Sequence, residues 1–326
     1  MKDHTQISDL PQPGREAGAG GALSIAAVER DTGLSKDTLR VWERRYGFPQ
    51  PVRDACDERL YPPDQLARLR LIARLLSAGL RPGRVVPLPL AELQQLAQQA
   101  APPDTTLAGS PELQALLTLV RRHEVLALRR ALNQAVLRLG LARFLTELLA
   151  PLNVQVGEAW VRGEMQVFEE HMYTESVVAV LRSALGSTGS MPQPGRPRVL
   201  LATFPQEAHA LGLLMAETML ALEGCECISL GAQTPVAEIV QAAQAHQAHI
   251  VALSFSAAFN AQLLLRGLQE LRERLPAAVQ IWVGGSHPVL QRRAPAGVTP
   301  VPRLQDIPRL LAPWTAQAGG NRRDAG

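Results

Sequence analysis

The fold is decided by residues 199–212, which read VLLATFPQEAHALG. The first five residues are apolar or β-branched, and a polar segment that contains a histidine follows them directly. Two later runs, residues 250–253 and 279–283, have the same character, and helical patterns separate them. This alternation is typical of parallel strands in a doubly wound α/β sheet, so we predict a Rossmann-like domain over residues 197–315.

Polar residues or glycines follow each predicted strand. His209 comes after the first strand, Ser254 and Ser256 close the second, and Gly284-Gly285 end the third. Ligands of such sheets bind beyond the carboxyl ends of the strands, so these residues are expected to converge on one rim. The imidazole can bind a metal, the hydroxyls can form hydrogen bonds, and the glycine pair lets a large ligand approach the backbone.

The order and spacing of these residues resemble the cobalamin-binding domain shared by cobalamin-dependent methyltransferases, mutases and photoreceptors. Glu207, His209 and Gly212 match the family's acidic-x-His-x-x-Gly element, and the serines and the glycine pair match its two later elements. The resemblance implies that His209 binds the cobalt from below in place of the dimethylbenzimidazole tail, which then runs past the other matched residues. Glu207 stands where the family usually has Asp, as a carboxylate partner for the second imidazole nitrogen. The alternative is a Rossmann-like domain in which the histidine caps a helix and the glycines are incidental.

Length and composition indicate a multidomain protein. The chain has 326 residues, more than one core normally supports, so two or three domains are expected. No apolar stretch is long enough to span a bilayer and the first residues have no signal-peptide character, so we expect a cytoplasmic protein without membrane contact. Cys56, Cys225 and Cys227 form neither a disulfide framework nor a zinc site.

A basic segment over residues 22–85 has the pattern of a helix-turn-helix. A glycine turn at Gly33 separates a first short helix from Ser35, which is a natural N-cap. A second helix is predicted over residues 36–46, and Gly47 closes it. Its basic residues lie on neighbouring turns, as a helix in a major groove requires; they are Lys36, Arg40, Arg44 and Arg45.

This segment closely resembles the winged-helix domain of the MerR family. The matching residues are Thr38-Leu39-Arg40-Val41-Trp42-Glu43-Arg44-Arg45-Tyr46-Gly47, Pro51-Val52-Arg53 and Arg59-Leu60-Tyr61. The resemblance implies that the recognition helix contacts double-stranded DNA through Lys36, Thr38, Arg40 and Arg44. It places Arg53, Arg59 and Tyr61 on the wing or among its backbone contacts, and Leu39, Val41 and Trp42 in the core. The alternative is a charged helical hairpin without a nucleic-acid partner. Metal-sensing members carry ligand cysteines beyond a long dimer helix, and because none lies there we expect no metal effector.

Between these two domains we predict a linker over residues 86–109 and a four-helix bundle over residues 110–188. The linker is rich in proline, glutamine and alanine around a short helix, whereas apolar residues recur at helical spacing through the bundle. The two ends, residues 1–21 and 316–326, are predicted to be a disordered arm and tail.

One motif in the bundle has two interpretations. Trp160 precedes Glu170-His171 in the pattern Trp-x9-Glu-His. In an unknown bundle this is a core aromatic residue and a polar face. Beside a cobalamin domain it resembles the signature of the light-sensing CarH/LitR-type repressors, which combine these domains in this order. The resemblance implies that the three residues contact the 5′-deoxyadenosyl group of adenosylcobalamin. Those relatives commonly have a histidine after the tryptophan, whereas this chain has Val161.

Together, these patterns predict a DNA-binding transcriptional regulator rather than an enzyme. The resemblance implies a repressor that senses adenosylcobalamin and, through this cofactor, light. It also implies a dimer or tetramer whose assembly controls binding to a DNA operator. One alternative is a corrinoid methyl-carrier protein of a methyltransferase, in which cobalt carries a methyl group. The other is a MerR-type regulator that has lost cobalamin binding; the intact His209 disfavours it.

Overall fold

The computed structural model describes residues 22–54, 57–77, 79–100, 110–188, 192–292 and 295–320. Its contacts divide the chain into two compact units. The first takes the chain up to Ala73 together with Pro82–Gln94, and the second takes Arg74–Arg81 and the chain from Gln95 onward. The predicted arm, residues 1–21, lies outside the described residues.

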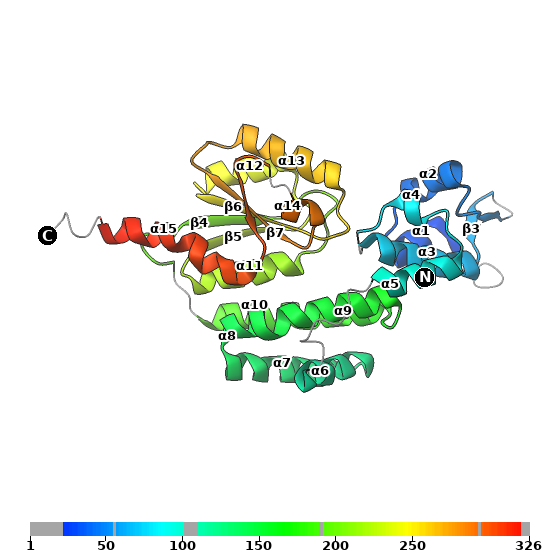
Figure 1. The fold of residues 1–326 in the computed structure, drawn as a ribbon, viewed down its shortest axis with the longest axis horizontal. Coiled ribbons are helices and arrows are strands. Elements are labelled where there is room, and N and C mark those ends of the chain that lie inside the picture. Colours follow the sequence, from blue (N-terminus) through cyan, green and yellow to red (C-terminus); the bar gives the residue numbers. More distant parts are fainter. Residues whose placement is uncertain are drawn as a thin grey trace, which may run out of the picture. The chain divides into compact units, whose positions relative to one another are not determined.

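The first unit is a small helical domain with a three-stranded antiparallel sheet in the order β1-β3-β2 (Figure 1). The elements over this part of the chain are β1 (Leu23–Ser24), α1 (Ile25–Thr32), α2 (Lys36–Tyr46), β2 (Val52–Arg53), β3 (Arg59–Tyr61), α3 (Pro63–Ser77), α4 (Pro82–Val85) and α5 (Leu90–Ala100). The last residues of α3 and of α5 are assigned to the second unit. The fold confirms the helix-turn-helix, which α1 and α2 form, and β2 and β3 pair as the wing.

Local interactions set the bounds of α2, the predicted recognition helix. The Ser35 hydroxyl accepts a hydrogen bond from the Thr38 N–H at 3.1 Å, which satisfies a free donor of the first turn. Gly47 ends the helix at φ +66°, a conformation that costs glycine nothing. Leu39 and Trp42 are buried. The prediction that Val41 belongs to the core is wrong, because its position on the helix turns it outward and leaves it 43% exposed.

The segment predicted as a linker begins with packed residues. Val86 and Leu93 are fully buried, and the first compact unit extends to Gln94. Because these side chains are buried, the domain predicted to end at residue 85 continues into α5, as far as Gln94. Residues 101–109, the rest of that linker, lie outside the described residues.

The second unit contains the predicted helical bundle. Its helices are α6 (Pro111–Arg121), α7 (Val125–Leu139), α8 (Leu141–Arg143), a π-helical stretch (Phe144–Leu149), α9 (Ala150–Arg162) and α10 (Val167–Thr188). Apolar residues spaced three or four apart bury one side of each long helix. In α6, for example, these are Leu113, Leu116, Leu117 and Val120.

The same unit contains a five-stranded parallel sheet in the order β5-β4-β6-β7-β8. The strands are β4 (Arg198–Ala202), β5 (Glu226–Gly231), β6 (Ile250–Phe255), β7 (Gln280–Gly285) and β8 (Val298–Val301). The helices are α11 (Leu211–Leu222), α12 (Val236–Ala245), α13 (Ala261–Arg274), α14 (Pro288–Arg292) and α15 (Ile307–Gly320). The predicted Rossmann-like architecture is therefore confirmed, with helices on both faces of the sheet (Figure 1).

The bundle and one face of the sheet share a hydrophobic core. Buried residues of α11, α15 and the sheet form one cluster with the bundle leucines, whereas α12 and α13 cover the opposite face with a second cluster. In Figure 1, α11 accordingly lies between the sheet and α10. Helix α15 runs to Gly320, so residues 316–320 are helical and the tail predicted from residue 316 was placed too early.

The sheet order places a ligand site at the ends of β4 and β6. The chain leaves β4 for β5 on one side and later returns to pair β6 with the other side of β4. Such a reversal of strand order opens a crevice at the carboxyl ends of the two strands.

Among the helices of the described residues, we find no segment with the length and apolar character of a transmembrane span.

Candidate functional site

His209 lies in the loop that connects β4 to α11, at this crevice. Its Nδ1 atom is 2.6 Å from Oε1 of Glu207, and its backbone N–H donates to the same oxygen at 3.0 Å. The imidazole is 63% exposed whereas the Glu207 carboxyl is 1% exposed. An ionised carboxylate can only accept, so in the neutral imidazole Nδ1 carries the proton and Nε2 keeps a free lone pair. That nitrogen is the atom a metal would bind.

Ser256 holds the other oxygen of the Glu207 carboxylate. Its backbone N–H and its hydroxyl both donate to Oε2, at 2.7 and 2.8 Å. Burial works against ionisation, but these hydrogen bonds and those from His209 outweigh it and lower the pKa of Glu207. The same carboxylate raises the pKa of His209. The longer side chain of glutamate thus reaches the imidazole and the end of β6 at once.

Thr203, which sequence reasoning missed, fixes the loop from the other side. Its fully buried hydroxyl donates to the carbonyl of Glu207 at 2.6 Å and accepts from the Gln233 N–H at 2.9 Å. It thereby connects the loop after β5 to the loop that carries His209. A threonine after a buried strand is common, so nothing in the sequence indicates that Thr203 joins these two loops.

Two predicted glycines are required by close approach. A Cβ atom on Gly212 would lie 3.0 Å from Oγ of Ser254, so α11 passes close to the end of β6. Gly285 has φ +104°, and a Cβ there would lie 2.1 Å from the carbonyl oxygen of Phe255. Gly284, opposite Ser254 in the sheet register, completes the glycine pair at the rim.

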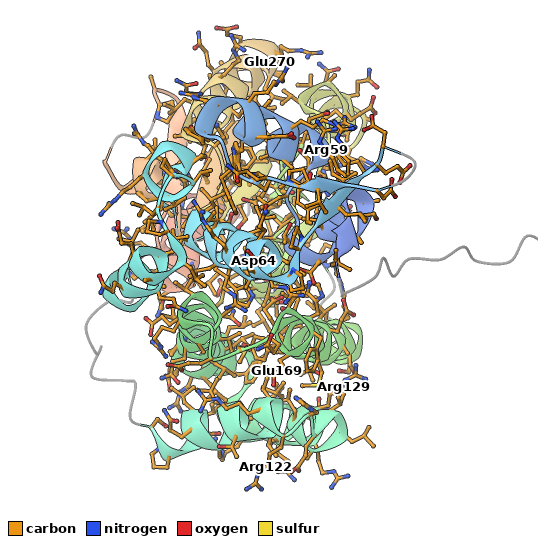
Figure 2. All side chains as sticks on the ribbon, turned by 90° about the vertical axis from the view of Figure 1, so that its right-hand side faces the viewer. Arg59, Asp64, Arg122, Arg129, Glu169 and Glu270 are labelled. Atoms are coloured by element: carbon orange, nitrogen blue, oxygen red, sulfur yellow. The ribbon has the colours of Figure 1, made fainter. Side chains whose placement is uncertain are left out.

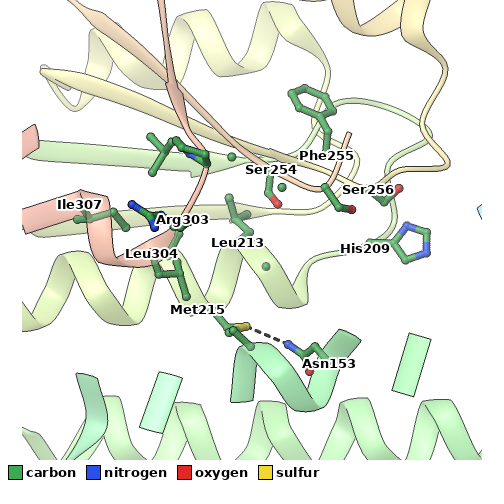
Figure 3. A pocket seen from close by; sticks show the side chains of 18 of the residues that line it. Asn153, His209, Leu213, Met215, Ser254, Phe255, Ser256, Arg303, Leu304 and Ile307 are labelled. Carbon is green, nitrogen blue, oxygen red and sulfur yellow. Dashed lines mark hydrogen bonds between the residues drawn. The ribbon is translucent and has the colours of Figure 1, made fainter. Parts of the chain in front are cut away.

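A cavity of about 710 Å³ opens between this rim and the bundle helix α9 (Figure 3). His209 lines it together with all the other predicted rim residues except Glu207. Away from the histidine its wall is mainly apolar, and the side chains there include Leu213, Ala216, Leu220, Trp282, Val301, Leu304 and Ile307. Such a space, with an imidazole at one place and an apolar slot at another, suits a large ligand that combines a metal with a flat aromatic group.

The bundle supplies a polar wall that sequence reasoning did not find. Thr146, Gln155 and Glu158 line the cavity from that side. Asn153 lines it too, donates from Nδ2 to Sδ of Met215 on α11 at 3.1 Å, and accepts from the hydroxyl of Tyr173 on α10 (Figure 3). Polar residues on a helix surface are ordinary, so only the packing of α9 over the sheet reveals their place.

The three predicted bundle residues are not among the described residues that line the cavity. Trp160 is partly buried against the core of the unit, and His171 is 72% exposed. Glu170 accepts from the Thr174 hydroxyl at 2.8 Å. Its charge also contributes, after that of Glu207, to raising the pKa of His209.

The predicted DNA-contact residues lie on α2 and on the wing. Lys36, Arg40 and Arg44 are four residues apart and share one face of α2. Thr38 Oγ1 is 2.8 Å from the Ser35 hydroxyl, which it helps to hold at the N-cap.

Acidic neighbours pair with most of these cations. Lys36 is 3.7 Å from Glu29, Arg40 is 3.2 Å from Asp37, Arg53 is 3.0 Å from Asp57, and Arg59 is 2.9 Å from Glu43. Of these residues, Arg59 is labelled in Figure 2. These pairs are exposed or half-exposed, and pairs of this kind contribute little, so phosphates can displace the carboxylates.

Tyr61 does not suit the role predicted for it. Its side chain is fully buried, since β3 turns it into the core of the first unit, and no described residue accepts from its hydroxyl. The assignment of Tyr61 as a DNA contact is therefore corrected to a core position.

Comparison with known proteins gives matches over both units. The family model "MerR HTH family regulatory protein" matches residues 23–87, and two B12 binding domain models match residues 112–184 and 197–298. The HTH-type transcriptional repressor CarH of Myxococcus xanthus is 29% identical over 258 residues, which cover 78% of this chain and 85% of that protein. The repressor CarA of the same organism is 30% identical over 234 residues, 72% of this chain and 76% of that protein. Among solved structures, the monomethylamine corrinoid protein of Methanosarcina barkeri aligns with a TM-score of 0.47 and 16% identity, over 60% of this chain and 94% of that one.

Proposed function

This chain belongs to the family of MerR-type transcriptional regulators with B12-binding domains that includes CarA and CarH, and we propose that it represses transcription in response to adenosylcobalamin. It is a cobalamin-sensing DNA-binding regulator. Because its target is operator DNA, we propose that it works in the cytoplasm.

One observation carries the cofactor assignment. Glu207 holds Nδ1 of His209 and leaves Nε2 free beside a large cavity whose far wall is apolar. A cobalamin bound through Nε2 needs room for its displaced base, and the groove past Ser254 and Gly284 offers that room. The carboxylate keeps the imidazole oriented and raises its electron density, as such partners do for metal-binding histidines.

The helical bundle would contact the upper ligand of the cobalt, which in adenosylcobalamin is the adenosyl group. We assign this to Trp160, Glu170 and His171, and the electrostatic influence of Glu170 on His209 supports the assignment. The indole would fill space against an adenosyl group, and the acid and the imidazole would form hydrogen bonds with its ribose. Bound adenosylcobalamin would supply a cobalt–carbon bond that light can break.

DNA recognition is assigned to α2 and the wing. Lys36, Thr38, Arg40 and Arg44 would enter the major groove, whereas Arg53 and Arg59 would contact phosphates. Because these cations would neutralise phosphates and release the counterions condensed on the DNA, binding should weaken as the salt concentration rises.

Assembly would connect the two events. If the adenosyl form favours a dimer or tetramer, that oligomer presents several DNA-binding domains to neighbouring half-sites and gains effective concentration. Loss of the adenosyl group would then let the bundle move, so that the oligomer dissociates and the chain leaves the DNA. Because Val161 cannot bind a metal, we expect that this position does not capture cobalt after illumination.

The decisive experiment measures operator binding and oligomer size under the same conditions. An operator is selected from random DNA with the adenosylcobalamin-loaded chain in darkness, and binding is then compared in darkness, after illumination, and with cyanocobalamin. The proposal is supported if the protein retards the operator DNA and forms a larger oligomer only with adenosylcobalamin in darkness. Equal binding by the cofactor-free chain, with unchanged size, would refute it.

A further inference from the structure

Arg303 occupies a distinctive place in the cavity. It follows β8 and precedes α15, and it is the one arginine or lysine among the described residues that line the cavity. Its side chain is 71% exposed, so it lies at the opening rather than in the apolar interior. The carboxylate that lines the cavity, Glu158, comes from the bundle on α9, where Arg162 lies 3.7 Å from it.

Asp306 holds one edge of the Arg303 guanidinium. Nη2 donates to Oδ1 at 3.2 Å and Nε is 3.4 Å from Oδ2, while Asp306 itself is 8% exposed. No described residue accepts a hydrogen bond from Nη1. The guanidinium is thus oriented by a buried acid and keeps donors for an anion, in the geometry that suits phosphate oxygens.

The ligand has one permanently anionic group. Cobalamin carries a phosphodiester in the nucleotide tail that joins the corrin to its lower base, and its other side chains are neutral amides. When His209 takes the place of that base, the tail must extend away from the histidine toward the apolar wall formed in part by Leu304 and Ile307. In the view of Figure 3, His209 and Arg303 lie on opposite sides of Ser254, so a tail that extends away from His209 past Ser254 would approach Arg303.

We propose that Arg303 binds the phosphodiester of the cobalamin nucleotide tail and that Asp306 positions it. This inference rests on cobalamin binding at His209. It adds a charge contact that selects corrinoids with a complete tail over those without one. It differs from a purely structural role, in which the Arg303–Asp306 pair only secures the start of α15 and every corrinoid is affected alike.

The test compares Arg303→Gln with the parent chain on three corrinoids, all as adenosyl forms in darkness. Cobinamide has no phosphate, cobinamide phosphate has the phosphate without the base, and cobalamin has the whole tail. We expect the variant to bind cobalamin and cobinamide phosphate at least about tenfold more weakly, and cobinamide with unchanged affinity. Binding is followed by the change in the corrin absorption spectrum, with no DNA present.

Two controls separate charge from folding. Arg309→Gln removes an exposed arginine of α15 that does not line the described cavity, and it should leave all three affinities unchanged. Asp306→Asn should weaken binding of the phosphate-bearing corrinoids less than Arg303→Gln does, since the cation remains. Thermal unfolding of each variant without ligand checks that the domain is intact.

The outcomes are distinct. Equal weakening of all three corrinoids, or no change for any, would overturn the role of Arg303. If the parent chain bound none of the three, the B12 assignment itself would fail and this inference with it. If the parent bound them and only the phosphate-bearing ones lost affinity in the variant, the contact would be established.

Discussion

Nδ1 of His209 lies 2.6 Å from the buried carboxylate of Glu207, whose second oxygen accepts two hydrogen bonds from Ser256. The candidate metal-binding histidine is therefore oriented by a carboxylate that is itself buried. The carboxylate also joins the ends of two neighbouring strands, β4 and β6. Changes at Glu207 should consequently alter the geometry at Nε2 even though Glu207 itself does not line the cavity.

Replacing Glu207 with glutamine should weaken cobalamin binding by about 10–100-fold. The amide is neutral and can present a donor where Nδ1 also donates, so the imidazole loses its fixed tautomer. His209→Ala, which removes the nitrogen, should weaken binding further. Spectral titration of the apoprotein measures both. Glu226→Gln, at an exposed position of β5, is the matched control, and parental affinity in Glu207→Gln would contradict this account.

Thr203→Val should destabilise the second unit by about 1–3 kcal/mol, because the Gln233 N–H and the carbonyl of the buried Glu207 each lose the hydroxyl as a hydrogen-bond partner. Thr203→Ser keeps the hydroxyl and should recover most of that loss. Denaturant unfolding without cofactor gives the free energy of unfolding. If valine and serine behave alike, the hydroxyl does not hold the loop.

Gly212→Ala should weaken cobalamin binding, since the new Cβ would lie 3.0 Å from Oγ of Ser254 and push into the groove. Adding Ser254→Ala removes that oxygen and should restore part of the affinity. Affinities of the two single variants and the double variant form a thermodynamic cycle. Strict additivity would show that the two positions do not meet.

On the DNA side, Arg44→Ala should weaken operator binding by about 1–3 kcal/mol if the arginine contacts a base edge. Tyr61→Phe should leave DNA affinity unchanged, because the phenol is buried and its hydroxyl has no partner among the described residues. Gel-shift titrations at one fixed salt concentration compare the two variants. A loss of operator affinity in Tyr61→Phe that exceeds its effect on stability would return the residue to the DNA interface.

Cys225 and Cys227 should resist alkylation in the folded protein. Burial raises the pKa of each thiol to about 12, so at pH 8 only about one thiol in ten thousand is the reactive thiolate. In a Cys56→Ser background, iodoacetamide should modify these cysteines slowly in the native state, and faster as pH rises. Unfolding should return the ordinary rate, and mass spectrometry counts the modified sites. Rapid labelling of the native protein at pH 8 would contradict the burial of these thiols.

The sequence alone determined the features that depend on short-range interactions and on periodicity. The bounds of α2 follow from a cap between Ser35 and Thr38 and from the left-handed Gly47, all of which act within a few residues. The strands before His209, Ser254 and Gly284 follow from apolar runs, and parallel pairing brings their ends together in any sheet of this kind. The DNA-binding and B12-binding assignments could be made because their motifs lie on such elements.

Tertiary structure alone decided which side chains those elements meet. The residues next to Tyr61 and Val41 in the sequence do not show whether either side chain is buried, yet packing buries Tyr61 and leaves Val41 exposed. Asn153 reaches the cavity only because α9 packs over the sheet, and Thr203 gains its role from two loops that are distant in sequence. The positions of Trp160, Glu170 and His171 against a bound cofactor stay a prediction. Burial and long-range hydrogen bonds depend on neighbours that a chain acquires only when it folds, and for that reason periodicity and motifs could not show them.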